Sequence, residues 1–231
     1  MKTIGLLGGM SWESTVIYYR AINEAVRETL GGFHSAPITL HSVDFHHIEA
    51  LQHAGDWVGA GHALADAARL VEAGGADFLV LCTNTMHKVA PSIENAISIP
   101  LLHIADATAE ALVSKHYQRV GLLGTQFTME QNFYKGRLGE HYGLDVRVPD
   151  SADQQRVHQI IYEELCQGVV REESRQVYLD IINKLHAEGA QAIILGCTEI
   201  GLLVKPEHTP VPLFDTTLEH VNMAVKRAMD V

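Results

Sequence analysis

"GADFLVLCTNT" (residues 75–85) and "GAQAIILGCTE" (residues 189–199) are two stretches of the chain that align with each other without a gap. Each opens with Gly-Ala, continues through an apolar run and closes on polar residues. Apolar runs of this kind are typical of parallel strands that helices cover on both faces. In the alignment Thr83 falls on Cys197, so the sequence predicts the same strand end twice, with a thiol at only one of the two.

The rest of the chain repeats in the same order. "TIGLLGG" (residues 3–9) returns as "RVGLLGT" (119–125), and "IPLLHIADAT" (99–108) returns as "VPLFDTT" (211–217). Any two β-α-β segments share glycines and aliphatic residues, which is the alternative explanation. Four landmarks in one order favour an internal duplication.

The repeat predicts an α/β fold of two pseudo-symmetric small domains, each a mainly four-stranded parallel sheet flanked by helices. We expect residues 1–102 with 210–231 to form the first domain and residues 103–209 to form the second. Residues 153–187 are expected to be helical. Ligands of parallel α/β sheets bind at the carboxyl ends of the strands, so we expect the active site in the cleft between the domains.

Composition narrows the function classes. The chain has 231 residues, 47% hydrophobic and 19% charged, which supports a real core. Its formal net charge of -11 would repel nucleic acid and anionic membranes, so neither is an expected partner. Gly8 and Gly9 interrupt the first apolar run, which reads as a strand and not as a signal peptide. Three cysteines favour reduced thiols and a cytoplasmic protein.

Two strand ends that face one another suit one kind of chemistry. A planar carbanion has two faces, and a racemase or epimerase needs an acid/base on each. Cys197 is a suitable base because a thiol pKa lies near 8.5 and falls at a helix N-terminus. The residues after Cys197, "TEIGLL", are expected to start such a helix, whose amides would favour the thiolate.

The motifs "IGLLGGMSWEST" (residues 4–15), "CTNT" (82–85) and "GCTEIGLL" (196–203) carry a family resemblance. Over essentially its whole length the chain resembles the aspartate/glutamate racemases that work without pyridoxal phosphate. The match is strongest with enterobacterial members described as broad-specificity, or as L-aspartate/glutamate, racemases. The resemblance implies two similar α/β domains, an active site between them, no cofactor, a two-base mechanism and a homodimer.

The chain departs from the family at Thr83, because the usual motif there reads Cys-Asn-Thr. Cys82 is one residue earlier and should point to the opposite face of its strand, as a core thiol, unless a bulge turns it inward. By resemblance Cys197 deprotonates the L-amino acid, and Thr83, or a water that it orders, reprotonates the opposite face. Enantiomers have equal free energy in water, so a Thr/Cys pair cannot make a one-way racemase.

Further residues are predicted to hold the substrate. The chain has no Lys or Arg between Ile38 and Arg69, where some aspartate racemases use an arginine, so glutamate or neutral amino acids become plausible substrates. By resemblance Gln52 contacts the substrate there, although it could be a solvated helix residue. Glu199 could bind the substrate ammonium. The predicted substrate-binding residues are Met10, Ser11, Gln52, Asn84, Thr85, Thr125, Thr198 and Glu199.

Other sequence patterns give weaker indications of function. His46-His47 has no second cluster with ligand spacing, so no metal site is expected. "GLLGGMSWEST" lacks the Gly-Lys-Ser/Thr ending of a phosphate loop. His87 could lie near the site or on the surface. Cys166 is expected to be a packing residue in a helix.

We therefore predict a cofactor-independent amino-acid racemase with Cys197 and Thr83 as its acid/base pair. Two alternatives stay open. One is a single-cysteine decarboxylase or isomerase on the same scaffold, which release of CO2 would reveal. The other is an amino-acid-binding protein without catalytic activity, which would bind its ligand without exchanging the hydrogen at Cα.

Overall fold

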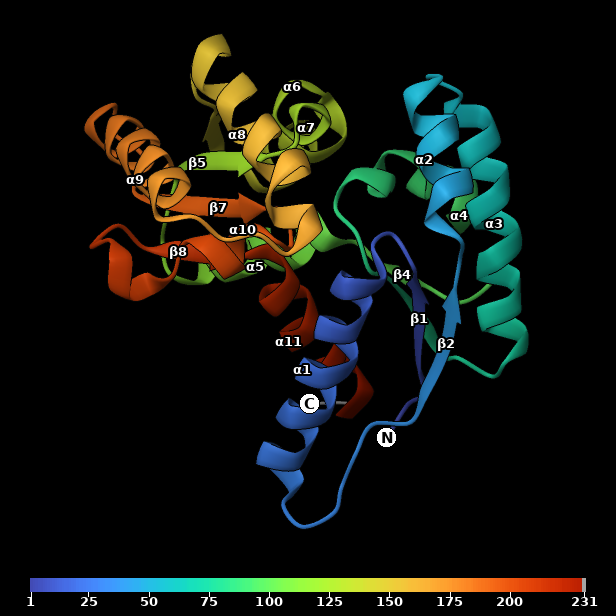
Figure 1. Cartoon of the computed structure of the whole chain (residues 1–231). Coiled ribbons are helices and arrows are strands. Elements are labelled where there is room, and N and C mark those ends of the chain that lie inside the picture. Colours follow the sequence, from blue (N-terminus) through green and yellow to red (C-terminus); the bar gives the residue numbers. More distant parts are fainter. Residues whose placement is uncertain (230–231) are drawn as a thin grey trace. The chain divides into compact units, whose positions relative to one another are not determined.

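Two parallel sheets organise the chain, and Figure 1 shows the computed structural model, which describes residues 1–229. Each sheet has four strands, in the orders β2-β1-β3-β4 and β6-β5-β7-β8. Every pairing is parallel. This confirms the predicted fold class. The strands are β1 (Ile4–Gly8), β2 (Ile38–Ser42), β3 (Phe78–Leu81), β4 (Leu101–Leu102), β5 (Arg119–Gly124), β6 (Asp145–Arg147), β7 (Ala192–Gly196) and β8 (Leu213–Asp215).

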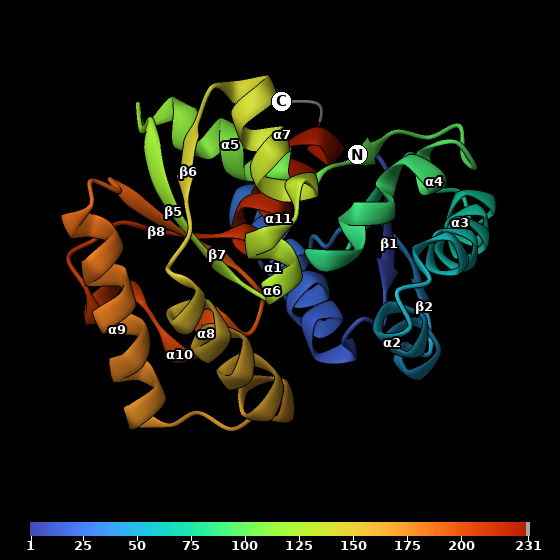
Figure 2. The ribbon, with the colours of Figure 1, turned by 90° about the horizontal axis from the view of Figure 1, so that it is seen from above.

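The first unit comprises residues 1–104 and the described residues from 220 onward. Helices cover both faces of its sheet, as Figures 1 and 2 show around β1. Leu7 and Leu81 pack into a cluster with α2 and α3, whereas Ile4 and Val80 pack on the opposite face with α1 and α11. The helices are α1 (Trp12–Leu30), α2 (Phe45–His53), α3 (Trp57–Ala73), η1 (Thr85–Val89), α4 (Ala90–Glu94) and α11 (Thr216–Met229).

The second unit, residues 105–219, repeats this arrangement. Leu123 and Leu195 pack into one cluster with residues of α8, α9 and α10. Figure 2 shows α8 and α9 on one side of the second sheet, with α5 and α7 on the other. Its helices are α5 (Ile104–Ser114), α6 (Gln126–Glu130), α7 (Asn132–Tyr142), α8 (Ser151–Glu163), η2 (Leu165–Gln167), α9 (Glu172–Ala187), α10 (Ile200–Leu203) and η3 (Pro206–His208).

The chain passes between the units twice, each time next to the last strand of a sheet. Helix α5 follows β4 of the first unit but belongs, from residue 105, to the second. Helix α11 follows β8 of the second unit and belongs, from His220, to the first. Residues 210–219, expected in the first domain, belong to the second unit because β8 pairs with β7.

The long helical segment predicted over residues 153–187 is two helices. Helix α8 ends at Glu163 and α9 begins at Glu172. Between them Gly168 adopts a left-handed conformation with φ of 73° after the short helix η2. The amide of Val169 donates to the carbonyl of Glu164 at 3.0 Å and closes the turn. Glycine favours this conformation because it has no Cβ to clash with the backbone.

The turn from β1 to α1 forms one strand end of the first sheet. Gly9 has φ of +97°, and a Cβ there would lie 2.3 Å from the carbonyl oxygen of Val43. Its amide donates to the Thr15 hydroxyl at 2.8 Å. Ser11 then caps α1 by accepting a hydrogen bond from the amide of Ser14 at 3.3 Å. The turn thus brings the start of α1 close to the end of β2.

We expect Gly9→Ala to destabilise the protein by about 1–3 kcal/mol or more, because the side chain meets both an unfavourable φ and the backbone of Val43. The matched control is Gly32→Ala, where φ is +58° and a Cβ would meet nothing within 4 Å. Urea unfolding of both variants measures the difference. Equal losses would show that the contact with Val43 contributes nothing.

Candidate active site

The first strand end carries Thr83. The last ladder bond runs from the amide of Cys82 to the carbonyl of Leu7 at 2.9 Å, after which the chain turns and the Thr83 amide donates to Leu81 at 2.8 Å. Thr83 and Asn84 are then nearly buried, and Thr85 begins η1. The polar triplet therefore lies immediately beyond the sheet, where the backbone is free of strand pairing.

Cys82 is a core thiol, as the alternation of side chains predicts. It is fully buried in the cluster that packs against α1 and α11, on the face opposite to Leu81. Burial raises the pKa of its thiol far above the ordinary value. Cys82 is therefore inert and does not replace the cysteine that the family motif would have at position 83.

Three further predicted residues lie in the first unit. Met10 follows β1 and packs in the cluster of α2 and α3. Ser11 caps α1. Gln52 lies on α2 and is 5% exposed.

The second strand end carries Cys197, Thr198 and Glu199. One carboxylate oxygen of Glu199 accepts hydrogen bonds from the Cys197 thiol at 2.9 Å and from the Thr198 hydroxyl at 2.6 Å. The Ile200 amide donates to the Cys197 carbonyl at 3.1 Å. Cys197 packs against the cluster of α8, α9 and α10 while staying partly exposed. A thiol, a hydroxyl and a carboxylate therefore share one strand end.

The environment of Cys197 opposes its ionisation. Burial raises the pKa of the thiol well above its ordinary value, and the charge of Glu199 and its hydrogen bond raise it further. The expectation that a helix start would favour the thiolate is wrong for this conformation, because α10 has only four residues, and burial and Glu199 outweigh it. Without substrate the thiol is protonated.

Thr125 lies at the end of β5, next to β7. Its hydroxyl caps α6 and lies 3.2 Å from that of Thr128. Thr125 is 6% exposed. The predicted residues of the second unit thus gather at the ends of two adjacent strands, as those of the first unit other than Gln52 do at the ends of β1 and β3.

Sequence reasoning missed one buried residue beside the thiol. Tyr178 of α9 interacts electrostatically with Cys197, and its hydroxyl donates to the Val157 carbonyl at 3.2 Å. An aromatic residue on the apolar face of a helix gives no sequence signal for such a place. Cys166, expected to pack, is exposed in η2.

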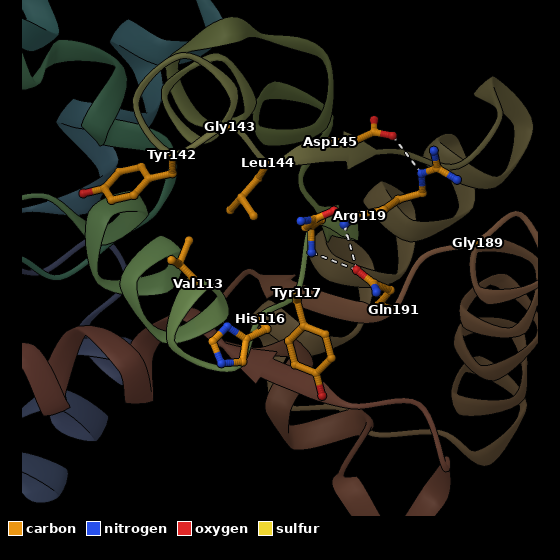
Figure 3. Close-up of a pocket in the computed structure, with 11 residues that line it drawn as sticks. Val113, His116, Tyr117, Arg119, Tyr142, Gly143, Leu144, Asp145, Gly189 and Gln191 are labelled. Atoms are coloured by element: carbon orange, nitrogen blue, oxygen red, sulfur yellow. Dashed lines mark hydrogen bonds and ion pairs between the residues drawn. The ribbon is translucent and has the colours of Figure 1, made fainter.

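The pocket in Figure 3 contains none of the predicted site residues. It has a volume of about 730 Å³ and lies in the second unit at the amino ends of β5 and β6. Its polar groups bind one another: Arg119 donates to Asp145 at 2.7 Å, and the Gln191 side-chain carbonyl accepts from the amides of Gln118 and Arg119. Because ligands of parallel sheets bind at the carboxyl ends, this pocket is no rival to the strand ends.

His46 and His47 do not form a metal site with other ligands. Residues 1–229 contain no group of three or more His, Cys, Asp or Glu side chains placed to hold a metal ion. In the same range, no helix is long and apolar enough to cross a membrane.

Comparisons with known proteins identify the family of the chain. The Asp/Glu/hydantoin racemase family model matches residues 7–224. A Yersinia pestis protein provisionally described as an Asp/Glu racemase is 55% identical with a TM-score of 0.94, covering 99% of this chain and 100% of that one. An aspartate racemase homologue from Pyrococcus horikoshii is 33% identical with a TM-score of 0.87 over 99% and 100% of the two chains.

A third relative is the broad-specificity amino-acid racemase RacX of Bacillus subtilis, 27% identical over 67% of this chain and 66% of its own length. The match of the family model over nearly all of the chain decides the assignment. The protein is a member of the Asp/Glu/hydantoin racemase family and, as a racemase, an isomerase.

Proposed function

We propose that the chain interconverts the L- and D-forms of aspartate and glutamate, and accepts neutral amino acids, by proton transfer at Cα without a cofactor. The observation that carries this proposal is the equivalence of two strand ends. Thr83 and Cys197 each lie two residues beyond a buried leucine, Leu81 or Leu195, on matching strands of two sheets with the same strand order. Such a pair supplies one acid/base for each face of a carbanion.

Cys197 is the base toward the L-enantiomer. Its thiolate takes the α-proton after the thiol proton has passed to Glu199 along the 2.9 Å hydrogen bond and from Glu199 to solvent, which balances the proton that Thr83 later takes from solvent. The substrate ammonium next to Glu199 offsets the negative charge that the thiolate brings, so binding itself favours ionisation. In this arrangement Glu199 binds the substrate ammonium. The substrate carboxylates are bound by Asn84, Thr85, Thr198 and Thr125.

Thr83 is the acid on the opposite face. A hydroxyl is a poor base but a competent donor, so the step from L to D ends with a proton from Thr83, or from a water that it orders. The hydroxyl regains its proton from solvent. Because the equilibrium constant of racemisation is one, kcat/KM must be equal in both directions, although kcat and KM can each differ.

Gln52 favours a broad choice of side chains. It is a neutral, buried amide, and the segment between Ile38 and Arg69 contains no arginine or lysine that could pair with a side-chain carboxylate. A neutral amide binds an uncharged polar side chain about as readily as a carboxylate. Met10 and Ser11, at the end of β1, would form a further part of the pocket.

Two variants should affect the exchange of the α-proton and the inversion of the Cα configuration differently. In D2O the Cys197→Ala variant should lose exchange of the α-proton of L-aspartate or L-glutamate by about 100-fold or more, because no base remains. Thr83→Ala should keep most of this exchange and lose inversion. Proton NMR measures exchange, and chiral chromatography of the same samples measures inversion.

The matched control for the thiol is Cys166→Ala, which removes an exposed cysteine and should leave both rates unchanged. If no amino acid exchanges its α-proton with the wild-type protein, the racemase proposal is refuted. If CO2 is released from a malonate instead, the chain is a decarboxylase.

The raised pKa of Cys197 predicts a pH dependence. The thiolate fraction of the free protein should be small at pH 7 and rise toward pH 9, so kcat/KM should rise over that range. Glu199→Gln removes a negative charge and an acceptor that holds the thiol proton, which lowers the thiol pKa. Iodoacetamide should therefore alkylate Cys197 faster at pH 7.5 in Glu199→Gln than in its parent, both in the Cys166→Ala background. An unchanged alkylation rate would contradict the role of Glu199.

We also propose a homodimer that uses the outer face of α1. Trp12, Val16 and Tyr19, spaced one and two turns apart, are 64%, 44% and 53% exposed, and Phe33 in the following loop is fully exposed. Exposed apolar patches mark interaction sites. The same face carries both signs of charge, on Arg20, Glu24 and Arg27, so a second copy of α1 can meet it in a symmetric contact.

Light scattering should give twice the chain mass for the wild-type protein and the chain mass for Tyr19→Glu. The control is Val58→Glu, an exposed apolar residue on α3, which should remain dimeric. A monomeric wild-type protein would refute the dimer. A dimeric Tyr19→Glu variant would place the interface elsewhere.

A further inference from the structure

A buried histidine lies directly behind Thr83. His87, in η1, is 2% exposed and belongs to a set of three buried histidines with His103 and His220. The ring centroids are 4.5 Å from His87 to His103 and 5.8 Å from His87 to His220. None of the three has a place in the proton transfers described above.

The hydrogen bonds of His87 define its tautomer. Nε2 lies 3.2 Å from the amide nitrogen of Ile104, which can only donate, so Nε2 is the acceptor. Nδ1 therefore carries the hydrogen and donates it to the carbonyl oxygen of Thr83 at 2.7 Å. Burial and the two neighbouring histidines lower the pKa of His87 well below its ordinary value, so the ring stays neutral.

Hydrogen bonds to neighbouring groups also define the tautomer of His220 and hold it in place. Nε2 of His220 donates to the Leu102 carbonyl at 2.8 Å, so Nδ1 accepts from the Tyr18 hydroxyl at 2.9 Å. Tyr18 belongs to α1, His220 to α11 and Leu102 to β4. The Thr83 carbonyl is thus hydrogen-bonded to His87, which packs against His220 inside the first unit.

We propose that His87 is a positioning residue that holds the turn at Thr83 so that its hydroxyl is presented to the substrate Cα. The inference rests on the proposed function. The Thr83 backbone is no longer paired with a neighbouring strand. Without the imidazole, its carbonyl oxygen would be buried with no hydrogen-bond donor. A buried carbonyl without a donor would rotate toward another partner, and the adjoining side chains would move with it.

The second unit supports a role specific to the threonine end. The residue equivalent to His87 is Gly201, which cannot donate from a side chain, and the Cys197 carbonyl is held by the Ile200 amide instead. His87 is therefore not a requirement of the repeated fold. With both ring nitrogens engaged, His87 is also unable to take a proton from the substrate without breaking a bond.

The test compares exchange with inversion. His87→Leu keeps a similar volume and removes the donor, so inversion of L-glutamate should fall about 100-fold while the exchange of its α-proton, which depends on Cys197, changes less than about threefold. His87→Asn can restore a donor near the position of Nδ1 and should recover at least about tenfold of the lost inversion. Both rates come from the same D2O samples, with a thermal melt of each variant.

The matched control is His103→Asn, at another buried histidine of the set, which should leave the ratio of inversion to exchange unchanged. Equal losses of exchange and inversion in both His87 variants would overturn the proposal and assign His87 to stability alone. If His87→Leu does not fold, His87→Ala, which also lacks the donor, takes its place, and an unchanged ratio in that variant would overturn the proposal equally. Absence of exchange in the wild-type protein would instead refute the racemase function itself.

Discussion

The hydrogen bond from the Cys82 amide to the Leu7 carbonyl is the last tie between β3 and β1, and it determines where the chain leaves the first sheet. One residue later the backbone has no strand partner and can present polar groups. The second sheet reaches the same point at Gly124 and Gly196, paired residues whose strands approach so closely that a Cβ on Gly196 would lie 2.9 Å from the Leu123 carbonyl. The proposed chemistry depends on these exits, because Thr83 and Cys197 follow the apolar strands there.

Charge explains why the proposed site should need its substrate to become active. Cys197 and Glu199 share a hydrogen bond in which a proton separates two groups that would both be negative without it. A thiolate beside a carboxylate at this depth is costly, and the amides of one four-residue helix do not compensate for it. An amino acid brings its own ammonium group. A site of this kind discriminates against molecules without a cation, whatever their side chain.

The sequence predicts the sheets well because buried parallel strands consist of continuous apolar residues. The runs "FLVL" and "AIILG" are of this kind. It predicts the strand-end residues because they follow those runs directly. It fails where tertiary structure decides: residues 210–219 follow β8 into the second unit, and burial and Glu199 raise the pKa of Cys197. His87 illustrates the limit, since nothing in "TNTMH" tells whether the imidazole faces solvent or the Thr83 carbonyl.

The two units share one strand order, but the polar groups behind their strand ends differ. At the end of the fourth strand the first unit has His103, and the second has Asp215, whose burial raises its pKa to about 6 while it caps α11. The proposed catalytic positions differ in the same way, with the hydroxyl of Thr83 at one and the thiol of Cys197 at the other. Because kcat/KM must be equal in the two directions, such asymmetry cannot bias the equilibrium. It can only set how tightly each enantiomer is held and how often a removed proton returns to the face from which it came.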